Sequence, residues 1–227
     1  SLVSVGFTQG LNILLNMFFG PTVNAARGVA VQVQNAVNSF VVNFQTALNP
    51  QLTKNVAVED FDASKKLFVA SSKFSFYLLC ILGLPIIGCA DWILSLWLKE
   101  VPQFTVVFVR YMIIICMFQS LANPIRVVNQ AEGNIKKFQI WECSFLLLIV
   151  PVSYLALKEG FRPECVFIIQ LVIEIFAQFI RISIVLPKIK MKISDYMQGV
   201  YFRIIPALIV PLGITLGLCK ILPLGFL

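Results

Sequence analysis

Residues Leu11–Pro50 have the sequence LNILLNMFFGPTVNAARGVAVQVQNAVNSFVVNFQTALNP, in which Gly20-Pro21 separates two apolar runs. The second run has the length of a membrane-spanning helix, but uncharged polar side chains recur among its Val, Ala, Phe and Leu residues. These are Asn24, Gln32, Gln34, Asn35, Asn38, Ser39, Asn43, Gln45, Thr46 and Asn49. Arg27 is the one charge in the stretch. A polar but uncharged stripe on such a helix indicates a surface that faces water or sugar rather than lipid.

The composition of the whole chain points to the bilayer as its solvent. Of its 227 residues 59% are hydrophobic and 13% are charged, and its mean hydropathy is +0.88. A soluble domain carries about 25% charged residues, so this chain has too few polar groups to cover a globular surface. We therefore predict an all-α, polytopic bundle of transmembrane helices.

Several functional classes are disfavoured by what the sequence contains. The net charge of +7 comes from Lys and Arg dispersed between apolar runs, a pattern of membrane topology rather than of nucleic-acid binding. The chain has no His, and its six Cys stand alone without a C-x-x-C pair, which removes His-based triads and the usual zinc motifs. We expect no enzyme, no metal site and no cofactor.

Seven apolar segments are long enough to cross a bilayer core of about 30 Å, which needs roughly 20 residues. They lie at about 2–19, 24–48, 67–90, 104–123, 138–157, 165–186 and 201–222. Gly20-Pro21 ends the first segment, Asn49-Pro50 the second and Pro124 the fourth. The chain begins at Ser1 without a Met and is apolar within a few residues, so we expect it to start inside or just before a membrane helix.

Lys and Arg are distributed unequally between the two predicted sides of the membrane. The side that carries the loops at 51–66, 126–137 and 187–200, with the basic run Lys188–Lys192, collects twelve of them, and the other side collects five. Basic residues favour the cytoplasmic side, so these loops are predicted to be cytoplasmic. The Gly20-Pro21 hinge and the Trp-containing connector at 91–103 are then predicted to face outside.

The polar side chains of the first two segments recur at helical spacing. Gln9, Asn12 and Asn16 share one face of the first, and Gln32, Asn35 and Ser39 lie near one face of the second. Such faces have two interpretations: hydrogen bonds between helices, or the lining of a hydrated cavity. We favour the cavity because two helices joined by a tight turn need fewer amides than this to associate. Amides both donate and accept hydrogen bonds, which suits sugar hydroxyls.

Charged side chains inside the predicted spans are the other candidates. Arg27, at the outer start of the second span, is either an ordinary interfacial cation or a contact for an anion such as a lipid diphosphate. Glu174 lies near the middle of the sixth span, where it would carry a proton or pair with Arg110 or Arg181. Glu142 is predicted to form an interfacial salt bridge with nearby Lys136 and Lys137.

The segment Phe18–Lys54, FFGPTVNAARGVAVQVQNAVNSFVVNFQTALNPQLTK, resembles the start of the second half of polysaccharide and lipopolysaccharide biosynthesis exporters. Three later pieces are similar to the same family: WILSLWLKEVPQFT at Trp92–Thr105, AEGNI at Ala131–Ile135 and PVSYLAL at Pro151–Leu157. These exporters are lipid-linked oligosaccharide flippases of the multidrug/oligosaccharidyl-lipid/polysaccharide exporter superfamily. The resemblance covers nearly the whole chain.

The resemblance implies a fold of two six-helix lobes facing each other across a cavity. Residues 1–200 would be the second lobe, with its first span cut short, and residues 201–227 would begin additional C-terminal membrane helices. The partners would be a polyprenyl-diphosphate-linked sugar, membrane lipids and a first lobe that precedes this chain. The implied location is the bacterial inner membrane, crossed many times, with no nucleic acid involved.

We therefore expect a lobe of a flippase that works by alternating access. The expected substrate-binding residues are Asn12, Asn16, Arg27, Gln32, Asn35, Asn38, Asn43 and Arg110, with Arg27 and Arg110 at the diphosphate. Two alternatives remain open. A multidrug exporter of the same fold, coupled to H⁺ or Na⁺, would use Glu174 for ion coupling. A non-transporting scaffold of a polysaccharide assembly complex would use the amide faces as protein contacts.

Overall fold

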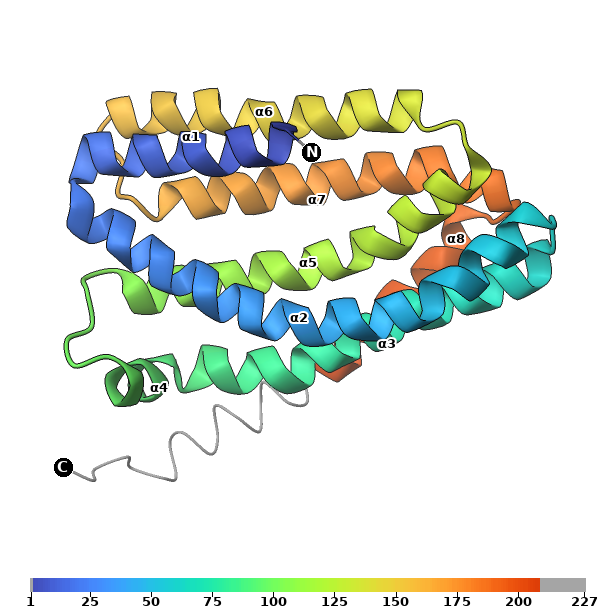
Figure 1. The fold of residues 1–227 in the computed structure, drawn as a ribbon, viewed down its shortest axis with the longest axis horizontal. Coiled ribbons are helices and arrows are strands. Elements are labelled where there is room, and N and C mark those ends of the chain that lie inside the picture. Colours follow the sequence, from blue (N-terminus) through green and yellow to red (C-terminus); the bar gives the residue numbers. More distant parts are fainter. Residues whose placement is uncertain (1, 209–227) are drawn as a thin grey trace.

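The computed structural model of this chain describes residues 2–208, and nothing in that range is a strand. Its helices are α1 (Leu2–Phe19), α2 (Pro21–Ala57), α3 (Phe61–Gly88), α4 (Ala90–Trp97), α5 (Thr105–Glu132), α6 (Lys136–Lys158), α7 (Cys165–Val185), η1 (Leu186–Ile189), α8 (Ile193–Tyr196) and η2 (Met197–Tyr201). Residues 202–208 continue as α-helix. The all-α prediction is confirmed (Figure 1).

Four of these helices are long and apolar enough to cross a membrane: Phe61–Gly88, Thr105–Glu132, Lys136–Lys158 and Cys165–Ile189. The stretch Val5–Phe19 of α1 is apolar but shorter. Helix α2 is long enough to cross a membrane, but its amide side chains make it less apolar than these four helices. The seventh predicted span, 201–222, lies mostly outside the described residues. The structure thus supports a helical membrane protein, and the number of seven spans stays a prediction.

The long helices run antiparallel, and their turns gather at two opposite ends of the molecule (Figure 1). The turn between α1 and α2 and the segments 98–104 and 159–164 lie at the left end of the view. The turns at 58–60, 133–135 and 186–192 lie at the right end. These two groups match the two sides assigned from the distribution of Lys and Arg. We call them the hinge end and the basic end.

Two helix ends predicted from proline are wrong. Helix α2 continues through Pro50 to Ala57, and α5 continues through Pro124 to Glu132. A proline removes one backbone hydrogen bond and crowds the preceding turn. Packing against neighbouring helices compensates for that loss in a membrane bundle. Helix α2 packs along both α3 and α5, so it stays helical for 37 residues.

Small residues bring α3 and α5 into close contact. A Cβ atom on Gly83 would lie 2.7 Å from Cγ2 of Ile113, so only glycine fits there. Four serines of α3 are buried, namely Ser64, Ser71, Ser72 and Ser75, and small side chains of this kind allow helix backbones to approach each other. Helices α2, α3 and α5 therefore form one tightly packed unit.

Gln45 connects the three helices of this unit by hydrogen bonds. Its Nε2 donates to Oγ of Ser75 at 2.9 Å and to the carbonyl of Ser120 at 3.0 Å, and its Oε1 accepts from Nδ2 of Asn123 at 2.6 Å. Gln45 is 1% exposed. One amide of the α2 stripe is thus an interhelical bond rather than part of an open surface.

Candidate functional site

The remaining polar stripe of α2 is mostly open. Gln32, Asn35 and Asn43 are exposed and Asn38 is half-buried, whereas Val37 and Val41 are buried in the bundle. Residues 32, 35, 39, 43 and 46 follow one another at helical spacing, so they share a side of the helix. The exposed stripe therefore contains amides where a lipid-facing helix would present apolar side chains.

The hydroxyls of the stripe bond to their own helix. Ser39 Oγ donates to the carbonyl of Ala36 at 2.7 Å, and Thr46 Oγ1 donates to that of Val42 at 2.8 Å. Such bonds satisfy a hydroxyl within the helix. The exposed amides Gln32, Asn35 and Asn43 are then the groups that offer donors and acceptors to something outside it.

Near the hinge end a polar chain joins α1 to α2. Arg27 Nη1 donates to Oδ1 of Asn12, and Asn12 Nδ2 donates to Oε1 of Gln9 at 3.2 Å. The tight turn between the helices needs Gly20, whose φ of 79° is in the left-handed region that favours glycine. Asn16, one turn beyond Asn12 on α1, is exposed. The structure thus brings Arg27 and Asn12 together, and their role in binding a substrate stays a prediction.

Arg27 is 4% exposed, and no carboxylate of the described residues forms an ion pair with it. Its Nε also lacks a hydrogen-bond partner in that part of the chain. A buried cation without an anion is destabilising by several kcal/mol. Arg27 is therefore placed to attract an anion.

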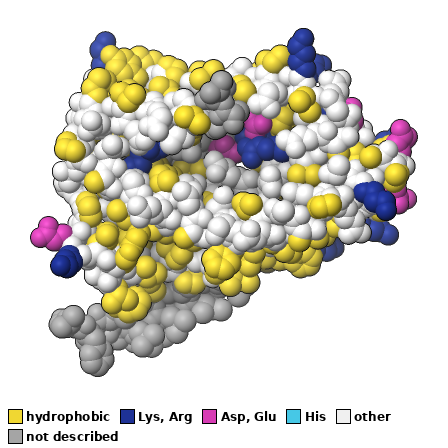
Figure 2. Space-filling view, in the orientation of Figure 1, with side chains coloured by type: hydrophobic (Ala, Val, Ile, Leu, Met, Phe, Trp, Pro, Cys, Tyr) yellow, Lys and Arg dark blue, Asp and Glu magenta, His cyan; other side chains and the backbone are white. Residues whose placement is uncertain are grey.

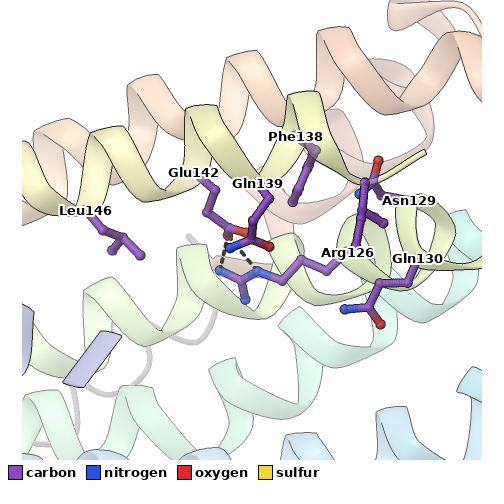
Figure 3. Close-up of a pocket in the computed structure, with 8 residues that line it drawn as sticks. Arg126, Asn129, Gln130, Phe138, Gln139, Glu142 and Leu146 are labelled. Carbon is purple, nitrogen blue, oxygen red and sulfur yellow. Dashed lines mark hydrogen bonds and ion pairs between the residues drawn. The ribbon is translucent and has the colours of Figure 1, made fainter. Parts of the chain in front are cut away.

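A pocket of about 380 Å³ lies between α5 and α6 towards the basic end. It is lined by Arg126, Asn129, Gln130, Ile135, Phe138, Gln139, Glu142 and Leu146 (Figure 3). Figure 2 shows a hollow in this face of the molecule, with acidic and basic side chains gathered in it. The pocket is thus lined by a cation, an anion, amides and apolar side chains. Such a lining suits a ligand that has hydroxyls as well as apolar faces.

Four charged side chains from three helices meet beside this pocket. Glu142 Oε1 accepts from Arg126 at 2.7 Å and lies 3.2 Å from Nη2 of Arg181, while Arg181 Nη1 donates to Glu174 Oε1 at 2.6 Å. Glu142, Glu174 and Arg181 are buried. Two cations and two anions balance, and this charge network (Arg126, Glu142, Glu174, Arg181) ties α5, α6 and α7 together.

This network shows which of the ion pairs predicted from the sequence are formed. Glu174 pairs with Arg181, two turns further along the same helix, which is one of its two expected partners. The predicted bridge from Glu142 to Lys136 and Lys137 is wrong. Residues five and six positions earlier lie on other sides of a helix, so both lysines are exposed while Glu142 turns inward to the arginines.

Arg126 and Asn129 are functional candidates that sequence reasoning missed. The prediction that Pro124 ends its span placed both residues in a loop, whereas both belong to the last turns of α5. Asn129 is buried, and its Oδ1 accepts from Lys188 Nζ at 2.9 Å. Lys188 also binds the carbonyl of Asn134 at 3.0 Å and the carboxylate of Glu132. Lys188, the first residue of the basic run, thus holds the turn at 133–135 beside the pocket.

Arg110 has partners on other helices. Its Nη2 donates to Oδ2 of Asp91 at 2.8 Å, and its Nε donates to the carbonyl of Ile87 at 3.1 Å. Its charge is therefore already partnered where α3 meets α4, whereas Arg27 binds α1. The role of Arg110 as a second diphosphate contact stays a prediction.

No protein family, curated protein or solved structure matches this chain.

Proposed function

We propose that this chain is one lobe of a membrane transporter that moves a lipid-linked oligosaccharide from one leaflet to the other. The observation that carries the proposal is the exposed amide stripe of α2, which ends near Arg27, a buried cation that has no carboxylate partner within residues 2–208. An uncharged polar surface and a lone cation match the two parts of such a substrate. The sugar offers hydroxyls and the polyprenyl diphosphate offers the anion.

The amides would bind the sugar through neutral hydrogen bonds. Amide side chains donate and accept equally, so Gln32, Asn35, Asn38 and Asn43 would hold hydroxyls in several orientations as the sugar passes. Hydrogen bonds to neutral groups are individually modest, at about 1 kcal/mol. A row of them binds without trapping the substrate, which transport requires.

Arg27 would take the diphosphate, with Asn12 orienting the guanidinium through its Oδ1. An arginine binds phosphate oxygens with two parallel hydrogen bonds, and Nη1 of Arg27 is already engaged by Asn12. The pocket between α5 and α6 would form the part of the cavity towards the basic end. A first lobe of the same protein would supply the opposite wall and complete the two-lobe exporter fold.

The test is surface polysaccharide in cells that carry the intact protein. Asn35→Leu removes an amide from the middle of the exposed stripe, and we expect it to abolish export while membrane insertion and protein level stay unchanged. The matched control is Phe40→Leu, a change at an exposed apolar position of the same helix, which should export normally. Wild-type polysaccharide with Asn35→Leu would refute the cavity assignment.

The ion-coupled multidrug exporter is the second candidate. It would need an acidic group that takes up and releases a cation, and Glu174 is the mid-span carboxylate available for this. Loss of cation-driven dye efflux with Glu174→Gln would favour this candidate over oligosaccharide export.

The scaffold alternative has a different prediction. Cysteines introduced at Gln32 and Asn43 should then be covered by a partner protein and protected from aqueous thiol reagents. In an export cavity the same cysteines react.

A further inference from the structure

A second concavity lies at the basic end, apart from the amide stripe. It has a volume of about 390 Å³ and is formed by the first half of α3 and the segment that follows η1. Its lining consists of Lys65, Lys66, Val69, Ala70, Lys73, Met191 and Asp195. Residues 65, 66, 69, 70 and 73 lie on one face of α3, so three lysines and two small apolar side chains line the concavity together. We call it the lysine pocket.

The walls of the lysine pocket are held together by packing. Tyr196 is fully buried and its ring stacks on Phe68 with centroids 5.2 Å apart. Gly199 lies against Val69, where an added Cβ would meet Cγ1 of Val69 at 3.3 Å. The segment after η1 is thus fixed on α3, and the concavity is part of the folded structure.

The charge of the lysine pocket is positive and largely uncompensated. Neither Lys66 nor Lys73 forms an ion pair with a residue in the described range, and the Nζ of Lys73 lies 5.3 Å above the ring of Phe74. Lys65 is 3.7 Å from Asp62, whose side chain is 90% exposed, so that pair is weak. Asp195 is the one acidic residue of the lining.

The pocket lies where an apolar helix reaches its polar end. Helix α3 is one of the four helices fit to cross a membrane, and Phe74, one residue beyond Lys73, is 51% exposed. A ligand at this place meets ammonium groups towards the turn and apolar carbon towards the middle of the helix. A soluble anion would contact only the lysines. An anionic phospholipid would contact the lysines with its headgroup and the apolar surface of α3 with its acyl chains.

We propose that the lysine pocket binds the headgroup of an anionic phospholipid of the phosphatidylglycerol type. The phosphate lies among Lys65, Lys66 and Lys73, the glycerol rests over Val69 and Ala70, and the acyl chains follow α3 past Phe74. This lipid is a bound structural partner on the side predicted to be cytoplasmic. The inference does not depend on oligosaccharide export.

The test measures lipid binding to the purified chain by native mass spectrometry, with phosphatidylglycerol and phosphatidylcholine as probes. We expect one phosphatidylglycerol to bind with clear preference over phosphatidylcholine. Each lysine near an anionic lipid surface contributes about a fivefold factor in binding, so Lys66→Gln/Lys73→Gln should weaken this binding about 30-fold.

The matched control is Lys136→Gln/Lys137→Gln, which removes the same charge from two exposed positions at the same end of the molecule. It should leave the preferred lipid bound. Equal weakening by both double variants would refute the pocket, because it would show general attraction of lipid to a basic surface.

A variant that keeps the charge tests the shape of the site. Ala70→Phe fills the floor of the pocket and should reduce phosphatidylglycerol binding while all three lysines remain; unchanged binding would refute the assignment. Soluble glycerol phosphate identifies the source of the anion. Its displacement of the lipid at equal concentration would show that the acyl chains contribute nothing, and would overturn the phospholipid proposal.

Discussion

The two buried arginines of this protein, Arg27 and Arg181, lie in opposite electrostatic settings. Both are about 3 to 4% exposed. Arg181 contacts Glu142 and Glu174 and belongs to a network with balanced charge, whereas the partner of Arg27 is the neutral side chain of Asn12. A balanced network fixes helices relative to one another. An unbalanced cation is available to an anion from elsewhere, so burial alone does not separate an arginine that ties helices together from one that can bind a ligand.

The largest expected effect is that of Arg181→Met. Removing this cation leaves Glu174 buried without a partner and Glu142 with one arginine instead of two. Breaking a buried ion pair from one side costs about 3–5 kcal/mol. Thermal unfolding of the purified chain in detergent should show a large loss of stability, and the double variant Glu174→Gln/Arg181→Met should recover part of it. Unchanged unfolding of the single variant would show that the network contributes nothing.

A smaller effect is expected from Asn12→Leu. This change removes the acceptor of the Arg27 guanidinium, and an unsatisfied buried donor costs about 1–3 kcal/mol. The same unfolding measurement applies, with Asn16→Leu, an exposed amide one turn away on α1, as the control that should change stability little. If both variants lose the same stability, the bond between α1 and α2 is not what Asn12 contributes.

The smallest loss of stability, and the sharpest contrast, is expected from Arg27→Met. Because Arg27 is a buried cation with no carboxylate partner among residues 2–208, replacing it with an apolar side chain of similar length removes an unpaired buried charge and should not lower the unfolding free energy. The exposed Arg162→Met is the control for loss of a surface charge. Export by the intact protein should nevertheless be lost with Arg27→Met. A destabilisation as large as that of Arg181→Met would remove the distinction between the two arginines.

Local sequence features were sufficient to predict part of this architecture. The all-α class follows from the composition, the turn from Gly20-Pro21, and the shared face of the α2 amides from residue spacing, because a face of a helix repeats with the helical period. The pairing of Glu174 with Arg181 was one of several alternatives that the sequence left open, and the structure shows it. These features depend on residues close together in the sequence.

The features that sequence reasoning missed depend on contacts between distant helices. Pro50 and Pro124 do not end their helices because neighbouring helices support the backbone there. Glu142 forms ion pairs with Arg126 and Arg181 because those arginines lie on the helices that it faces. Lys136 and Lys137 are closer to Glu142 in the sequence but do not pair with it. The lysine pocket joins α3 to a segment more than a hundred residues later, and no local pattern could have indicated it.

The uninterrupted course of α2 through Pro50 has a mechanical consequence. A helix of 37 residues is about 55 Å long, well beyond the thickness of a bilayer core. Helix α2 packs along α3 and α5, so the three would move as one body, and a rotation of that body by about 10° about the glycine turn would displace its opposite end by about 10 Å. A rotation that begins at the hinge end would therefore also move the basic end.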